Sequence, residues 1–245
     1  MRKIILGFLS APLAVNTASA APGVGDPVYG AIVGKGITEV EARYGRLTGG
    51  SADKEDGLIF EVEHGFTDKL AAAILLETGR DPGGRRLTNA VAVEAIYALG
   101  RIEPLALDVA LYGEYKLGTN GNPDVIEPKL LLQHRAGPFD ARVNLIAEKP
   151  LAPNEPIEFA YAASADWHVS GHQVKLGITA FGDFGTTRKF GGRQEHFIGP
   201  TGKFEIEHLG PGELEIEIGW LRAFGSARDE TDGQARLLIG YEFKF

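Results

Sequence analysis

Few residues in this chain have the types and spacing that catalysis requires. His168 and Ser170 are one residue apart, and a serine nucleophile needs a histidine to accept its proton and a third group to orient the imidazole. No distinctive motif flanks this pair, and it falls at a predicted short turn, where serine commonly hydrogen-bonds the local backbone. The chain has no cysteine, which excludes thiol nucleophiles and disulfide frameworks. The sequence therefore predicts no catalytic residues.

Patterns that would bind a metal ion or a phosphate group are also weak. The six histidines are scattered over different predicted strands, and the single methionine, Met1, leaves the folded region without thioether ligands for copper. The pairs Gly49-Gly50 and Gly83-Gly84 are followed by neither Gly-Lys-Ser nor a helix, so they indicate turns rather than phosphate-binding loops. We expect no metal and no cofactor.

The charged residues are the most informative group. The chain has 33 acidic and 25 basic residues, a formal net charge of −8, and this balance argues against nucleic-acid binding, which needs a surplus of lysine and arginine. In residues 105–117, apolar side chains occupy every second position, and Asp108, Glu114 and Lys116 lie between them. In residues 213–220 glutamates alternate with apolar residues in the same way. Alternate residues share one face of a strand, whereas a helix would spread these acids around its circumference.

The same period of two recurs along most of the chain and predicts about twelve strands. They are bounded by clusters of Gly, Pro, Asn and Asp. Residues 69–77, rich in alanine and leucine, would suit a helix equally well. The connections alternate between longer, glycine-rich and charged segments and short turns. The predicted strands span residues 37–47, 57–66, 69–79, 86–100, 105–117, 124–136, 139–149, 155–168, 172–183, 192–208, 213–224 and 233–245.

The first twenty residues have the parts of a secretory signal peptide. Arg2 and Lys3 precede an apolar stretch, and the segment closes on Ala18-Ser19-Ala20, a small-residue cleavage site. A transmembrane anchor is the alternative, but it needs about 20 apolar residues, and this run is shorter and interrupted by Pro12. We therefore expect three regions: a signal peptide over 1–20, a flexible lead-in over 21–36 and a barrel over 37–245. The lead-in could dip into the barrel mouth, but nothing in its sequence demands it.

The alternation fits either a water-soluble barrel or sandwich with its acids outward, or a membrane barrel with its acids in the lumen. Aromatic residues on the apolar face cluster towards strand ends, as girdles at the two membrane interfaces would. Long connections alternating with short turns, and an even number of strands, are what an outer-membrane barrel requires. These observations favour an all-β fold, a closed antiparallel up-and-down transmembrane β-barrel of about 12 strands.

The C-terminal strand carries a resemblance to a known group of proteins. The chain ends LLIGYEFKF, in which Tyr241, Phe243 and Phe245 lie on one face. This segment resembles the last strand of bacterial outer-membrane β-barrel proteins, which ends in alternating apolar and aromatic residues with a terminal Phe. The resemblance implies that these three residues form the signal recognised by the barrel assembly machinery. It implies no residues for any other function.

In a membrane barrel the charged positions line the lumen, and acids outnumber bases among them. An acidic lumen concentrates cations, so the sequence predicts a narrow, cation-preferring porin or passive channel for small hydrophilic solutes. The alternatives are a non-conducting barrel closed by salt bridges, structural or interacting with lipopolysaccharide, and, further off, an outer-membrane acyl hydrolase or a soluble periplasmic binding barrel. The predicted pore-lining residues are Glu41, Arg43, Glu61, Glu63, Glu94, Asp108, Glu114, Lys116, Lys129, Arg135, Arg142, Glu158, Lys175, Glu205, Glu215, Glu217 and Arg236.

These features together predict a location and partners. We expect export to the outer membrane of a Gram-negative bacterium, with both termini in the periplasm and the longer connections outside the cell. The expected partners are outer-membrane lipids and lipopolysaccharide, the assembly machinery, and a small solute or cation. Basic residues in the longer connections could bind lipopolysaccharide phosphates or simply keep the loops solvated, and both interpretations remain open. They are Lys54, Arg80, Arg85, Arg86, Arg188, Lys189 and Arg193.

Overall fold

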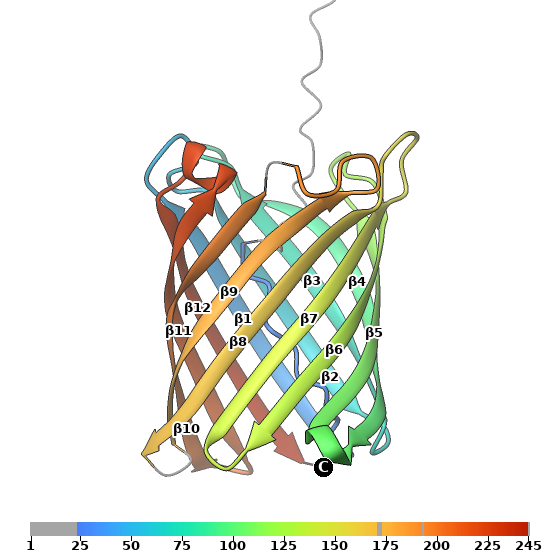
Figure 1. The fold of residues 1–245 in the computed structure, drawn as a ribbon, viewed down its shortest axis with the longest axis vertical. Coiled ribbons are helices and arrows are strands. Elements are labelled where there is room, and N and C mark those ends of the chain that lie inside the picture. The colour runs from blue at the N-terminus through green and yellow to red at the C-terminus, as the bar shows by residue number, and fades with distance from the viewer. Residues whose placement is uncertain (1–23, 171–172, 193, 245) are drawn as a thin grey trace, which may run out of the picture.

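Twelve antiparallel strands form a closed barrel in the computed structural model, which describes residues 24–170, 173–192 and 194–244 (Figure 1). Each strand pairs with its neighbours in sequence, and β1 pairs with β12 to close the sheet. Up-and-down closure leaves no unpaired strand edge, which a hydrocarbon environment demands. The strands are β1 (Ile37–Thr48), β2 (Asp56–Gly65), β3 (Leu70–Arg80), β4 (Leu87–Ile102), β5 (Leu107–Gly118), β6 (Val125–Ala136), β7 (Phe139–Pro150), β8 (Glu158–Ser170), β9 (Val174–Thr186), β10 (Glu195–Leu209), β11 (Gly212–Gly225) and β12 (Gly233–Lys244).

The predicted strand count is confirmed, and most boundaries lie within two residues of the prediction. The largest differences are three residues: β8 and β10 begin three residues later than predicted, and β9 ends three residues later. Proline cannot donate to a β-ladder, so Pro156 keeps the start of the predicted strand out of β8. The ambiguous segment around 69–77 is a strand, because β3 is hydrogen-bonded to β2 on one side and β4 on the other.

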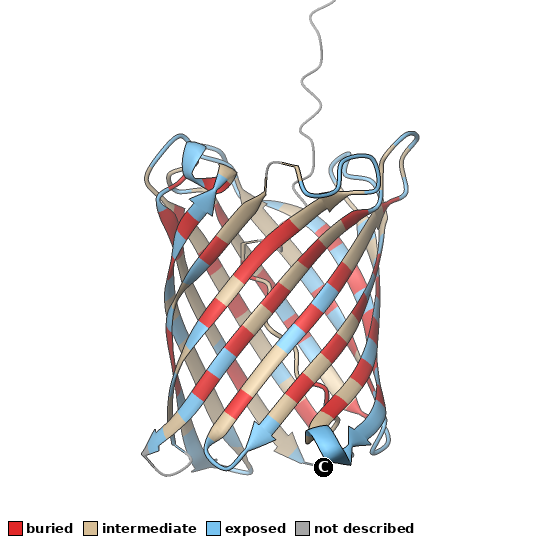
Figure 2. Cartoon of the chain, viewed as in Figure 1, coloured by how far each residue is buried: buried red, intermediate tan, exposed pale blue. Residues whose placement is uncertain are grey.

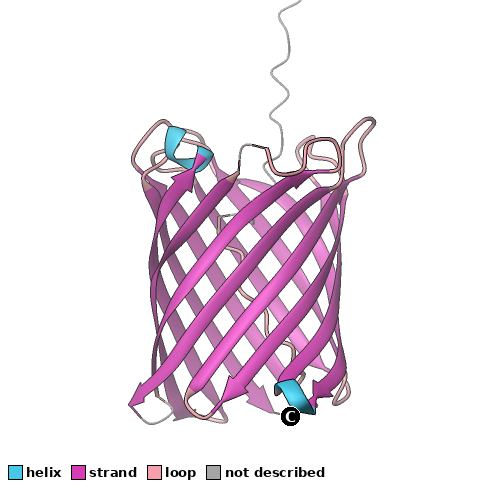
Figure 3. Ribbon diagram, viewed as in Figure 1, coloured by secondary structure: helices cyan, strands magenta, loops and turns pink. Residues whose placement is uncertain are grey.

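The connections gather by length at the two ends of the barrel. Longer connections (49–55, 81–86, 119–124, 151–157, 187–194 and 226–232) lie at what we call the long-loop end. Short turns (66–69, 103–106, 137–138 and 210–211) lie at the short-turn end. Two single-turn 3₁₀ helices, η1 (Glu103–Leu105) and η2 (Ser226–Asp229), sit at opposite rims (Figure 3). Within the described residues, no helix is long and apolar enough to cross a bilayer.

Burial alternates along the strands as the period of two predicts (Figure 2). In β4 the buried residues include Ala92 and Glu94, with 1% and 4% exposure. Val91 and Val93, each preceding one of them in the strand, are 41% and 54% exposed. The inner face thus carries small and charged residues, and the outer face carries large apolar ones. This inverted pattern suits a lipid-facing exterior.

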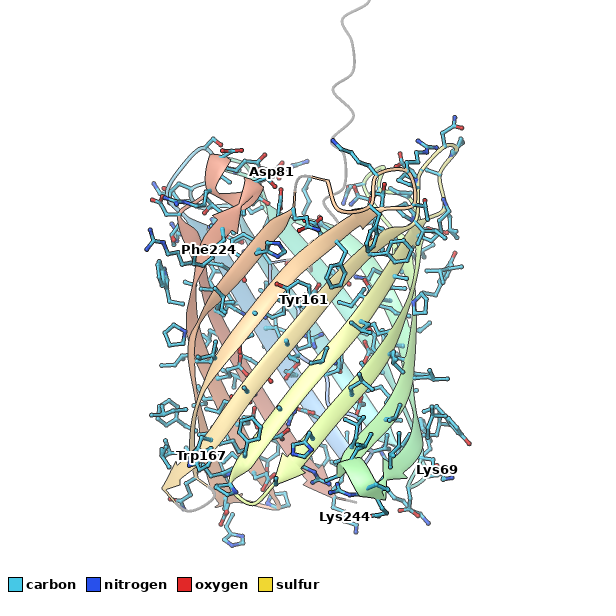
Figure 4. All side chains as sticks on the ribbon, viewed as in Figure 1. Lys69, Asp81, Tyr161, Trp167, Phe224 and Lys244 are labelled. Carbon is cyan, nitrogen blue, oxygen red and sulfur yellow. The ribbon has the colours of Figure 1, made fainter. Side chains whose placement is uncertain are left out.

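Aromatic side chains mark the outer surface near strand ends. Trp167, 52% exposed, lies at the short-turn rim, with its ring centroid 6.1 Å from that of Phe139 (Figure 4). Phe224 lies on the outside towards the long-loop end and is 42% exposed. In β12, the rings of Tyr241 and Phe243 are 5.8 Å apart, and Phe245 lies outside the described residues. Recognition of these three residues by the assembly machinery stays a prediction.

The N-terminal segment has a different place from the flexible lead-in that its composition predicted. Residues 24–36 run inside the barrel from the long-loop end to the short-turn end, where they join β1 (Figure 1). They are held there because polar side chains of the inner wall bond their backbone, as in the pair between Tyr29 and Asn144. The C-terminal end of β12 lies at the short-turn end. The signal peptide and the location of the termini stay predictions, because residues 1–23 lie outside the description.

A charge placed on the outer face tests which side of the sheet meets lipid. Val93 lies in β4 between Ile74 and Tyr115 of the neighbouring strands. We expect Val93→Arg to lower the free energy of unfolding by about 2–4 kcal/mol in phospholipid vesicles, the cost of arginine near a bilayer midplane. Urea titration followed by heat-modifiable gel mobility measures this, with Val93→Ile as the control. An arginine tolerated within about 0.5 kcal/mol, the usual effect of a water-exposed surface substitution, would argue for a soluble barrel.

Candidate functional site

The barrel lumen contains two cavities. The cavity at the short-turn end has a volume of about 510 Å³, and the cavity at the long-loop end about 410 Å³. The N-terminal segment lines both, with Tyr29 at the first and Asp26 at the second. Glu94, Tyr112 and Lys129, which face inward at mid-height, line neither cavity. We call these three residues with Tyr29 and Glu114 the central layer.

The central layer is bonded through phenol groups and carboxylates. The hydroxyl oxygen of Tyr112 lies 2.6 Å from Glu94 Oε2 and 2.9 Å from Glu114 Oε2, so its single proton can serve either carboxylate. The Tyr29 hydroxyl donates to Glu94 Oε2 at 3.0 Å. Lys129 Nζ lies 4.5 Å and 4.3 Å from the ring centroids of Tyr29 and Tyr112, within the range of cation–π attraction. The layer therefore fills the middle of the lumen with polar side chains that bond one another, although one oxygen each of Glu94 and Glu114 is buried without a hydrogen-bond partner.

Ion pairs line the wall of the short-turn cavity. Arg43, 2% exposed, contacts Glu61 at 2.6 Å and Glu41 at 3.0 Å. On β10, Lys203 Nζ lies 3.2 Å from Asp166 and 3.1 Å from Glu217. Buried charges need such partners, since an unpaired ion loses its hydration without compensation.

Carboxylates nevertheless exceed cations at this end of the barrel. Glu39 is the cross-strand neighbour of both Glu63 and Glu242, and Glu242 is the neighbour of Glu213. Within the described chain, these four carboxylates have no basic group within 4.0 Å. We call this run across β2, β1, β12 and β11 the acidic arc. The short-turn cavity as a whole is lined by eight acidic and five basic side chains.

The long-loop end has a different arrangement. The Asp56 side chain is fully buried, and Arg80 and Arg86 both form ion pairs with it. Two of the basic residues considered for lipopolysaccharide thus pair with a buried carboxylate, although their side chains remain 38% and 32% exposed. Lys116 pairs with Glu77 at 3.1 Å below them. Arg193 lies outside the described residues.

The predicted pore-lining residues fall into several groups along the lumen. Lys116 lines the long-loop cavity, Glu158 is buried at the first residue of β8, and Arg236 bonds the Asp26 carbonyl. Asp108 pairs with Arg101 at 2.9 Å, and Glu205 pairs with Lys175. Three others, Glu94, Glu114 and Lys129, belong to the central layer. The short-turn cavity is lined by Glu41, Arg43, Glu61, Glu63, Arg135, Arg142, Lys175, Glu215 and Glu217.

Several uncharged residues of the lumen were not among the predicted pore-lining residues. Tyr112, Gln133 and Asn144 are 3%, 3% and 0% exposed and sit in phase with the charged positions of their strands. That phase was a usable signal, because a polar side chain on the charged face must point inward. Tyr29 had no such signal, since residues 24–36 show no alternation.

Three carboxylates, Glu61, Glu63 and Glu94, bring one oxygen each within 4.8 Å of one another. A cation could bridge such oxygens. Glu61 is already neutralised by Arg43, however, and Glu94 accepts hydrogen bonds from two phenols. The group therefore gives no ground for assigning a metal site.

The His168–Ser170 pair lies at the short-turn end of β8, where the pairing with β9 shifts register. His168 lines the short-turn cavity. The Ser170 side chain lies outside the description, so the absence of catalysis stays a prediction.

The fold is similar to that of solved outer-membrane channels. An outer membrane channel from Pseudomonas putida F1 superposes with a TM-score of 0.64 at 13% identity, covering 90% of this chain and 99% of that one. The NanC porin gives 0.58 at 13% identity, covering 84% and 100%. The KdgM porin in complex with disordered oligogalacturonate gives 0.56 at 10% identity, covering 84% and 99%. The sequence matches no protein-family model, and no curated protein is significantly similar to it. The chain thus has the barrel fold of outer-membrane porins, confirming the predicted fold class.

The Arg43 cluster provides a test of the lumen's electrostatics. We expect Arg43→Met to lower the free energy of unfolding by about 3–5 kcal/mol, because it leaves two buried carboxylates without their cation. Replacing Glu41 and Glu61 by Gln in the same chain should restore most of the loss. Arg188→Met, in an exposed loop, is the control and should stay within about 0.5 kcal/mol. Urea titration in vesicles measures all three, and equal losses for Arg43→Met with and without the Gln changes would contradict the ion-pair interpretation.

Proposed function

We propose that this chain is an outer-membrane barrel that acts as a narrow, passive, cation-preferring channel for small hydrophilic solutes. The acidic arc carries the proposal. Like charges placed directly opposite one another destabilise a sheet, so a row of four carboxylates without basic partners is costly unless positive charge occupies the space between them. A solute or ion with positive charge supplies it.

The surroundings of the arc strengthen its effect on permeating ions. Low-dielectric walls around a narrow cavity focus the field of the charges that line it, so a net acidic lining attracts cations and repels anions. The long-loop cavity is lined by six acidic and three basic side chains, so its sign is the same. Both cavities therefore favour positive or neutral solutes.

The barrel fold supports passage but leaves the solute open. The KdgM structure holds oligogalacturonate, an acidic sugar chain. In the present chain the acidic arc would oppose an anion of that kind, so we propose a different charge preference on a similar barrel. The outer membrane of a Gram-negative bacterium, reached through a cleavable signal peptide, is the proposed location.

A non-conducting barrel is the second candidate. The ion pairs of Arg43 and Lys203 and the filled central layer favour it, because they occupy much of the lumen with mutually satisfied groups. Such a barrel would act through its surface, for example by binding lipopolysaccharide with the remaining loop bases. Conductance separates the two candidates.

The acidic arc predicts the sign of the ion selectivity. In planar bilayers under a salt gradient, the reversal potential of the purified protein should indicate preference for K⁺ over Cl⁻. The triple variant Glu39→Gln, Glu63→Gln, Glu242→Gln should lower the permeability ratio several-fold, because it removes charge that attracts cations. Asp68→Asn, an exposed acid in the turn after β2, is the matched control and should leave the ratio unchanged.

Two outcomes would count against the channel. If the unmodified protein prefers anions, the proposed role of the acidic arc in attracting cations is contradicted. Absence of current, both in the unmodified chain and in variants designed to clear the lumen, would favour the non-conducting barrel.

A further inference from the structure

The N-terminal segment follows the lumen over its length rather than crossing one end. At the short-turn end, Gly36 donates its backbone N–H to the Gly65 carbonyl at 2.7 Å. At the long-loop end, Val24 lies against the inner face of β2 at Gly57. Because the segment joins β1 at the short-turn end, only its long-loop end can withdraw without breaking the barrel (Figure 1).

Side-chain amides of the wall hold the segment's backbone. Asn144 accepts from the Tyr29 N–H at 2.8 Å and donates to the Tyr29 carbonyl at 3.0 Å, as a neighbouring strand would. Gln133 accepts from the Ala31 N–H at 3.0 Å. Buried backbone groups need partners, and the segment has no strand beside it to supply them. The inner wall thus provides a built seat for an extended peptide.

Tyr29 fixes the register of the segment in this seat. Its ring lies 4.8 Å from that of Tyr112 and beneath Lys129, and its hydroxyl bonds Glu94. The guanidinium of Arg43 lies 5.8 Å from the same ring. One side chain of the segment therefore completes the central layer that separates the two cavities.

Glycines on the inner face of β2 make room for the segment at both ends. A Cβ added at Gly57 would stand 2.0 Å from the Val24 carbonyl oxygen, and one at Gly65 would stand 2.0 Å from the Gly34 carbonyl oxygen. Neither glycine has a positive φ angle, so the strand itself does not require them. The residues between them on this face, Ile59, Glu61 and Glu63, all carry side chains. These glycines leave room for the segment's backbone at two of the points where it touches the wall.

We propose that residues 24–36 are a tethered plug that closes the lumen at Tyr29, and that withdrawal of its long-loop end joins the two cavities into one path. The plug is part of the same chain as the barrel, and Asn144, Gln133 and the central layer hold it in the lumen. It adds a gate to the proposed channel. The barrel wall does not depend on it, because every strand is paired without it.

The absence of cysteine allows a direct measurement of the plug's position. Ala31 is 2% exposed in the seat, so the thiol of Ala31→Cys should react slowly with a charged, water-soluble methanethiosulfonate reagent. Adding Gly57→Ala and Gly65→Ala should speed this reaction by about tenfold or more, since displacing the plug exposes the thiol. Gly113→Ala is the matched control, because a Cβ there meets nothing within 4 Å. Heat-modifiable mobility shows that each variant has folded.

Conductance gives the second measurement, and it separates the plug from the channel. The double variant Gly57→Ala, Gly65→Ala should carry a larger single-channel current than the unmodified chain, and Gly113→Ala should not. Faster thiol reaction without any current would support the plug and overturn the channel. Rapid reaction of the Ala31→Cys thiol without further changes would overturn the plug whatever the current. Equal rates for Ala31→Cys combined with the folded double variant and with Gly113→Ala would overturn it as well.

Discussion

The structure depends on the pairing of the first strand with the last. β1 and β12 are in register from Ile37 opposite Lys244 to Thr48 opposite Gly233, so neither strand keeps a free edge. In hydrocarbon no water can satisfy an unpaired N–H or C=O group, and only a closed sheet leaves none. Closure also places each strand side chain on one of two surfaces, the outer face or the inner face of the barrel. Residues at alternate positions lie either on the outer surface or in the lumen, and most charged strand residues of this chain lie in the lumen set.

The confinement of these charged side chains in a narrow lumen explains why most of them are paired. A twelve-strand barrel encloses a space between that of small, side-chain-filled barrels and that of wide porins. Here Arg43 and Lys203 each form ion pairs with two carboxylates, and the phenols of Tyr29 and Tyr112 both lie within hydrogen-bond distance of one oxygen of Glu94. The acids exceed the bases, so this pairing cannot be completed everywhere. The remainder is concentrated in the acidic arc, where four strands place glutamates at one level.

The sequence predicted the parts of this arrangement that depend on local spacing. A period of two was enough to place Glu114 and Lys116 on the inner face of β5, because the face of a strand residue is set by its own neighbours along the chain. The sequence pattern could not predict which charged residues form ion pairs. Arg43 contacts Glu61 because of the register between β1 and β2, which the local pattern does not encode. The place of residues 24–36 was missed for a related reason. Their backbone is held by Asn144 and Gln133, more than 100 positions away, and the segment itself has neither helical nor strand periodicity.

The energies of the seat and of the sheet differ in a way that bears on gating. A single hydrogen bond contributes about 0.5–1.5 kcal/mol net, and the segment is held by a handful of them together with the packing of Tyr29. Each barrel strand, by contrast, is bonded along its whole length on both sides. Local opening is drawn from the least stable parts of a structure, so the segment can leave the lumen at a cost far below that of unfolding the wall. A barrel closed by its own strands and filled by a separately held segment therefore has two independent stabilities. The first keeps the barrel wall intact, and the second sets how often the proposed plug leaves the lumen open.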